Sequence, residues 1–178
     1  MSGKNPREPA GKPGTREPSS PVCLASEADG RYMGYATREE LLAALNELLE
    51  AERAGARVAV QTARGAPDRE TQQLVTAIEQ DEVHWCAVLT RAIRGLEGEP
   101  SLKVGAFYEK AMAIPGIPER LVFLNRGQGW VMRKLRELLP KVRDDKLHGE
   151  LAEMLRRHEA NIALVNATLA GRKDGART

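Results

Sequence analysis

The sequence predicts an all-α fold: an antiparallel four-helix bundle with a long crossover between its second and third helices. Four stretches between residues 37 and 171 place leucine, isoleucine and valine at alternating steps of three and four, the spacing of amphipathic helices. No stretch shows the sustained two-residue alternation of a strand. Short breaks separate the first stretch from the second and the third from the fourth, so each pair forms a helical hairpin.

Length and composition indicate one globular domain. The chain has 178 residues, of which 42% are hydrophobic and 29% charged, enough to enclose a substantial core. Its formal net charge is only +2, so its overall field neither attracts nor repels nucleic acid strongly. The sequence lacks an uninterrupted apolar run of roughly 18 to 20 residues and the apolar centre of a signal peptide. We therefore expect a cytoplasmic protein of bacterial type without a membrane partner.

Residues 1–36 are predicted to form a flexible leader, because they are rich in proline, glycine and serine and have almost no apolar side chain to bury. Five basic residues in the leader are nearly balanced by four acidic ones, unlike a cationic nucleic-acid-binding arm. The bundle is predicted for residues 37–171 and a flexible tail for residues 172–178.

The first helical hairpin has recognisable ends. Thr37 and Glu40 have the spacing of a capping box, so the first helix is expected to begin at Thr37 and to run to about residue 64. Pro67 suits the first turn of the second helix, which Gly95 and Gly98 should close.

The second hairpin follows a crossover. Residues 99–116 contain one short amphipathic pattern between prolines and are predicted to connect the two hairpins. The third helix is expected over about residues 118–139, with Pro140 marking its end, and the fourth over about residues 144–170, with Gly171 as its terminating residue.

Each predicted helix carries a polar residue midway along its apolar seam, and the second carries a histidine three residues further on the same face. Burial of polar groups costs free energy unless it is compensated, so groups that meet at one level predict a site. A neighbouring apolar stripe on the second helix would turn Glu82 inward in place of Asp81, and this choice stays open. The seam residues are Glu52, Asp81 with His84, Gln128 and His158.

These motifs resemble the ferritin-like superfamily, with its bacterioferritin- and rubrerythrin-like four-helix bundles. Residues 45–52 (Leu-Asn-Glu-Leu-Leu-Glu-Ala-Glu) are similar to the first helix of that family, whose glutamate falls on Glu52. Residues 81–84 (Asp-Glu-Val-His) resemble the Glu-x-x-His of its second helix, with Asp81 and His84 in the ligand places. The resemblance implies a ferritin-like fold and a metal site between facing helices.

The second half of the chain departs from the family pattern. Gln128 replaces the carboxylate of the third helix, and Leu155 stands where a carboxylate should precede His158. The resemblance therefore implies a degenerate bacterial family of unassigned function and does not carry over iron storage, ferroxidase activity or a 24-subunit shell.

Charge counting favours one metal ion over two. Two carboxylates balance the charge of one divalent ion, whereas two ferrous ions would be under-neutralised. Two neutral imidazoles and an amide oxygen can complete the ligand set of the single ion. We expect a mononuclear or degenerate site for iron or manganese, with a redox or stress-related role and no organic cofactor. The predicted ligands are Glu52, Asp81, His84 and His158, with Gln128 as a further candidate.

A metal-free interpretation balances equally well, because two carboxylates and two protonated histidines also form a neutral buried network. The protein would then be a helical interaction module that binds an acidic partner through the basic region of its third and fourth helices. Acidic residues interrupt that region, so we do not expect nucleic-acid binding. The sequence decides neither whether the protein is an enzyme nor whether it forms a homodimer. The basic residues are Arg126, Arg133, Lys134, Arg136, Lys141, Arg143 and Lys146.

Overall fold

The computed structural model describes residues 34–175, with side chains up to residue 172. Most of the predicted leader and the end of the predicted tail lie outside these residues. The described part is helical and contains no strand. Its elements are α1 (Arg38–Arg64), α2 (Arg69–Gly95), α3 (Phe107–Met112), α4 (Ile117–Leu138), the short 3-10 helix η2 (Leu139–Lys141) and α5 (Asp145–Gly175).

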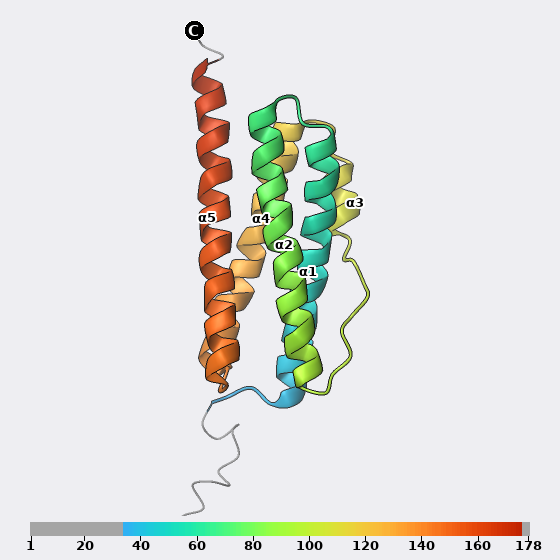
Figure 1. The fold of residues 1–178 in the computed structure, drawn as a ribbon, viewed down its shortest axis with the longest axis vertical. Helices are drawn as coiled ribbons and strands as arrows, with labels where there is room; N and C mark the ends of the chain where they lie inside the picture. Colours follow the sequence, from blue (N-terminus) through green and yellow to red (C-terminus); the bar gives the residue numbers. More distant parts are fainter. Residues whose placement is uncertain (1–33, 176–178) are drawn as a thin grey trace, which may run out of the picture.

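The four long helices form a bundle in which each contacts two neighbours (Figure 1). Helix α1 packs against α2 and α4, and α5 packs against α4 and α2. The segment between α2 and α4 runs along the outside of the bundle, and its short helix α3 contacts α1 and α4. This arrangement confirms the predicted two hairpins and long crossover. Across residues 34–175, the helices lack the combination of length and hydrophobicity that a membrane span requires.

The hairpin α1–α2 begins as the sequence predicts but turns differently. Thr37 and Glu40 form a reciprocal capping box, in which each backbone N–H donates to the other residue's side chain at 2.8 and 3.2 Å. At the start of α2, the Asp68 side chain accepts a hydrogen bond from the Thr71 N–H at 2.7 Å. The prediction that Pro67 lies in the first turn is wrong, because Asp68 caps the helix and Pro67 precedes the cap.

The ends of the second hairpin also differ in one respect. Asp144 accepts from the Leu147 N–H at 2.7 Å at the start of α5, and Pro140 lies in η2, just past the end of α4. Gly171 does not end α5, which continues to Gly175. Among the described residues only Gly34 and Glu97 have positive φ, so Gly171 keeps a helical backbone instead of the left-handed cap that glycine commonly provides.

The core consists of two apolar clusters with a polar layer between them. One cluster joins the first half of α1 to the second halves of α2 and α4 and the first half of α5. The other joins the second half of α1 to the first halves of α2 and α4 and to Val165 of α5. Between the clusters lies the buried Asn161 of α5, which donates to Asp81, and each long helix contributes one further buried polar side chain. These side chains are Glu52, Glu82, Gln128 and His158.

Candidate metal centre

Three buried side chains from three helices converge in the polar layer. Glu52 of α1, Glu82 of α2 and His158 of α5 each offer one ligand atom, and these atoms all lie within 4.8 Å of one another. Each of the three residues is at most 3% exposed. In the described part of the chain, no other group of three or more histidine, cysteine, aspartate or glutamate side chains has this geometry.

Glu82 fits into the layer because α1 has a glycine opposite it. A Cβ added at Gly55 would lie 2.5 Å from Glu82 Oε2 and 2.7 Å from its carboxyl carbon. A glycine in the interior of a helix costs about 1 kcal/mol relative to alanine. The local sequence of α1 thus accommodates the carboxyl group at some expense in helix stability.

A backbone carbonyl orients the His158 ring. Nδ1 lies 3.0 Å from the carbonyl oxygen of Met154, which can only accept, so Nδ1 carries a proton. Nε2 points toward Glu52 and lies 3.3 Å from its Oε1. In the neutral ring, Nε2 therefore has a lone pair directed into the cluster, the arrangement that metal-binding histidines use.

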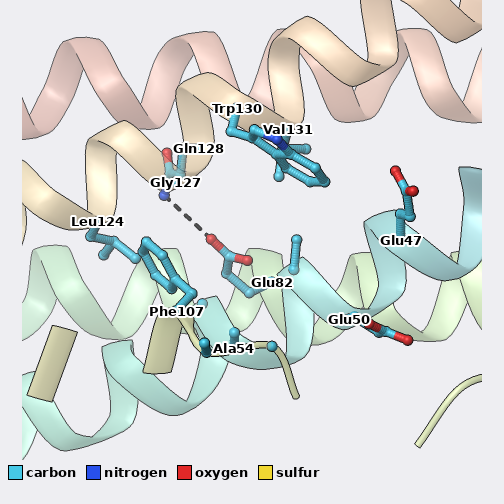
Figure 2. A pocket seen from close by; sticks show the side chains of 14 residues that line it. Glu47, Glu50, Ala54, Glu82, Phe107, Leu124, Gly127, Gln128, Trp130 and Val131 are labelled. Atoms are coloured by element: carbon cyan, nitrogen blue, oxygen red, sulfur yellow. Dashed lines mark hydrogen bonds between the residues drawn. The ribbon is translucent and has the colours of Figure 1, made fainter. Parts of the chain in front are cut away.

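Gln128 of α4 contacts the cluster from the fourth side. Its Nε2 donates to Glu82 Oε1 at 3.4 Å, a long hydrogen bond that is drawn in Figure 2. Its Oε1 is buried without a hydrogen-bond partner among the described residues. A half-turn of the amide would exchange the two atoms and present the oxygen to a cation next to Glu82.

Electrostatics disfavours two negative charges in this layer. Burial raises the pKa of Glu52 to about 8, although a hydrogen bond with Glu82 acts in the opposite direction. Burial, followed by the neighbouring Glu52, raises the pKa of Glu82 well above its usual value, and His158 partly offsets this. A protonated Glu82 can donate to Glu52; with both groups ionised, neither Glu52 oxygen has a hydrogen bond. The cluster therefore needs a proton or a cation.

Two of the sequence-predicted ligands lie outside the cluster. Asp81 accepts hydrogen bonds from Arg157 and Asn161 on α5, and its side chain is 19% exposed. His84 is exposed, and its ring lies edge-on to Trp85 at 4.7 Å. The structure thus brings together Glu52, Gln128 and His158, and it corrects the expectation that Asp81 faces inward.

The correction follows from the register of α2. The buried stripe runs through Ile78, Glu82, Trp85 and Leu89, and Asp81 lies one residue away from it, a rotation of about 100°. The residue three positions after the inward carboxylate is therefore Trp85, not a histidine. The apolar spacing of Ile78, Trp85 and Leu89 was the available signal for Glu82 in the sequence.

Comparison with known proteins agrees with this architecture. The fold is similar to a solved structure described as "Crystal structure of ferritin like, diiron-carboxylate proteins from Bacillus anthracis str. Ames", with a TM-score of 0.67. The two chains are 15% identical, and the match covers 74% of this chain and 96% of the other. This likeness confirms the predicted ferritin-like fold. No curated protein matches the chain.

A family model matches residues 39–167, which include every residue of the polar layer and at least part of all five α-helices. The family is described as "Domain of unknown function (DUF6306)". Its description assigns no activity or ligand. On this match, the chain belongs to the DUF6306 family.

Proposed function

We propose that this protein binds one divalent metal ion, with iron as the preferred metal, between Glu52, Glu82 and His158. The observation that carries the proposal is the convergence of these three buried ligand atoms within 4.8 Å. When Glu82 is ionised, both buried oxygens of Glu52 lack hydrogen bonds, and a cation can bind them. Gln128 is the fourth protein ligand in this proposal, after its amide rotates.

The charges and donors favour one ion over two. Ferritin-like two-metal sites use a carboxylate from each of four helices and a histidine from each of two. Here α4 contributes the neutral Gln128, and Trp85 and Leu155 occupy the places three residues from Glu82 and His158. Two carboxylates neutralise one divalent ion and leave two such ions under-neutralised.

Oxygen and imidazole donors suit iron, manganese and zinc. The similar solved structure is described as one of diiron-carboxylate proteins, which supports iron first. A bound iron would supply Lewis acidity and redox chemistry, consistent with a redox or stress-related role. The chain itself orients the ligands: the Met154 carbonyl fixes the His158 tautomer, and apolar clusters lie on both sides of the polar layer.

A metal-free polar network is the second candidate, and one contact favours it. The Gln128 amide already donates to Glu82, so the layer is partly satisfied without a cation. The associated acidic-partner role has less support, because Lys134 and Arg136 form ion pairs with glutamates of α1 and α5 at 2.9 and 2.7 Å. These pairs take up part of the positive charge of the basic region.

Metal reconstitution tests the proposal. Protein without a histidine tag is stripped with chelator, incubated separately with Fe²⁺ without oxygen, Mn²⁺ and Zn²⁺, freed of unbound ions, and analysed for metal content. We expect about one ion per chain for at least Fe²⁺. His158→Ala should lose this ion, whereas His84→Ala, the matched control at an exposed histidine, should retain it.

Circular dichroism and thermal melting establish that both variants are folded. Near-zero uptake of all three metals by the wild-type protein would contradict the proposal. Equal uptake by wild type and His158→Ala would place any bound metal elsewhere. Loss of stability in His158→Ala, combined with no metal uptake by the wild type, would support the metal-free network.

A further inference from the structure

A pocket of about 360 Å³ lies beside Glu82 and Gln128, between α1, α4 and the residues that lead into α3 (Figure 2). Its volume falls within the range of about 300–1,000 Å³ that is typical of small-molecule sites. The pocket exists because much of its lining has little or no side chain. These small residues are Ala51, Ala54, Gly55, Gly105, Ala106 and Gly127.

Close packing gives the pocket a fixed apolar wall. The Phe107 ring stacks on Phe123 with a centroid distance of 4.9 Å, and a Cβ added at Gly127 would lie 2.6 Å from Phe107 Cζ. The crossover is thereby packed tightly against α4. Leu124 lies beside the ring in Figure 2, and Trp130 and Val131 lie across the pocket from it. An aromatic ring or short alkyl chain fits such a surface.

The charged groups around the pocket are acidic. Glu47, Glu50 and Glu82 line it, and the described residues contribute no lysine or arginine to its lining. Lys134 pairs with Glu47 at 2.9 Å, and Glu82 is compensated by a proton or a cation in the polar layer, so Glu50 is the carboxylate that sets the charge of the pocket. Glu50 accepts a hydrogen bond from the Ser101 hydroxyl at 2.5 Å and has no cationic partner among the ion pairs of the described structure. This field favours a cation and opposes an anion.

We propose that the pocket binds a small primary amine that carries an aromatic or alkyl group. The apolar group lies against Phe107 and Val131, and the ammonium group lies toward Glu50. Such a molecule would reach the side of Glu82 that faces the pocket. Its role as a co-substrate or effector of the metal centre rests on the proposed function; its binding to the pocket does not.

Fluorescence titration of the metal-free protein tests this inference. Because no metal is present, the measured amine binding can be interpreted even if the metal proposal is wrong. The chain has two tryptophans, and Trp85→Phe leaves Trp130 as the reporter in the pocket lining. The probes are phenethylamine, 2-phenylethanol and phenylacetate, which have similar shapes and different charges. We expect saturable binding of the amine, binding of the anion weaker by about tenfold or more, and the alcohol in between.

Calorimetry on the wild-type protein should give the same order and shows whether Trp85→Phe has disturbed the site. Glu50→Gln should remove most of the difference between amine and alcohol. Equal affinity for all three probes, tighter binding of the anion, or no saturable binding of the amine would overturn the inference.

Filling the pocket provides a matched pair of variants. Ala51 and Ala56 are both half-buried on α1, and only Ala51 lines the pocket. Ala51→Leu should weaken amine binding by about tenfold or more, since the added atoms occupy the space of the ligand, whereas Ala56→Leu should leave it unchanged. Unchanged binding in Ala51→Leu would place the amine at another surface and reject the pocket.

Discussion

Two acidic clusters start from adjacent residues of α2 and reach the same helix, α5, yet they differ in how well their charges are satisfied. The outer cluster joins Asp81 to Arg157 and Asn161 through hydrogen bonds of 2.8, 3.0 and 3.0 Å. The inner cluster joins Glu82 to Glu52 and His158, and both Glu52 oxygens lack a hydrogen bond in the described structure. The outer carboxylate has a cationic partner in Arg157, whereas the two inner carboxyl groups share one histidine, whose Nε2 lies 3.3 Å from Glu52 Oε1.

This difference indicates different roles for the two clusters. The outer ion pair links α2 to α5 and is complete without any ligand. The inner carboxyl groups destabilise the metal-free fold unless they are protonated, because burial penalises their ionised form. Retaining two such groups at one level of the bundle is understandable if a cation binds between them.

The largest expected effect is a pH dependence of stability in the metal-free protein. Because the pKa of Glu52 is raised from 4.5 to about 8, its neutral form stabilises the fold below about pH 4.5, and this contribution is lost as the pH rises to about 8. Glu82 acts in the same direction. Urea unfolding should show that Glu52→Gln exceeds wild type by a few kcal/mol at pH 8 and by little at pH 4.5.

Asp81→Asn provides the contrasting measurement at the outer cluster. It should not reproduce the pH-dependent gain, because it removes a partner of Arg157 instead of a buried charge. If Glu52→Gln and Asp81→Asn gave the same pH profile, the two clusters would not differ as described.

Substitutions at the adjacent residues Asp81 and Glu82 should have different effects on metal affinity. Glu82→Gln removes a proposed ligand and should weaken metal binding by more than about 100-fold. Asp81→Asn, one residue away, should weaken it far less while lowering stability by about 1–3 kcal/mol. Calorimetric titration with Fe²⁺ or Mn²⁺ measures the affinities, and urea unfolding measures the stabilities. Equal losses of affinity in both variants would contradict the assignment of Glu82 as the inner ligand.

The affinity itself should depend on pH in the wild-type protein. Because the carboxyl groups must lose their protons to bind a cation, metal binding should weaken as the pH falls below about 8 and should release protons. Titrations in buffers with different ionisation enthalpies count the released protons. A pH-independent affinity with no proton release would show that the carboxyl groups with raised pKa take no part in metal binding.

The smallest expected effect concerns two glycines within helices. Gly55→Ala places a Cβ against the Glu82 carboxyl group. The carboxyl group must then move, so metal binding should weaken by about tenfold. Gly129→Ala meets nothing within 4 Å, so it should leave metal binding unchanged. It should stabilise α4 by up to about 1 kcal/mol. Similar metal affinities in the two variants would indicate that Gly55 does not position Glu82.

The overall fold could be predicted from the sequence because its signals are local and periodic. The capping box at Thr37 and the leucine seams specify helix type and approximate bounds, and connection lengths specify the hairpins. The end of α5 could not be predicted, since Gly171 is compatible with both a helical and a left-handed backbone. The first residue of α2 was also not predicted correctly, because Pro67 is compatible with the first turn of a helix, whereas Asp68 caps the helix in the structure.

The site could be predicted less completely, because the direction of a side chain depends on the rotation of each helix. Glu52, Gln128 and His158 lie on single unambiguous seams, and the structure places all three in the polar layer. On α2 two overlapping stripes compete, and the choice between Asp81 and Glu82 depends on contacts with other helices. The glycine opposite Glu82 and the pocket beside it are tertiary features that the spacing within one helix cannot reveal.

Anomalous diffraction from crystals loaded with Fe²⁺ or Mn²⁺ tests the central claim most directly, because it locates the metal independently of activity or stability. We expect one anomalous peak per chain within bonding distance of the Glu52 and Glu82 carboxylates and His158 Nε2, with the Gln128 amide rotated toward it. A polar layer without a peak, in which Gln128 still donates to Glu82, would contradict the account.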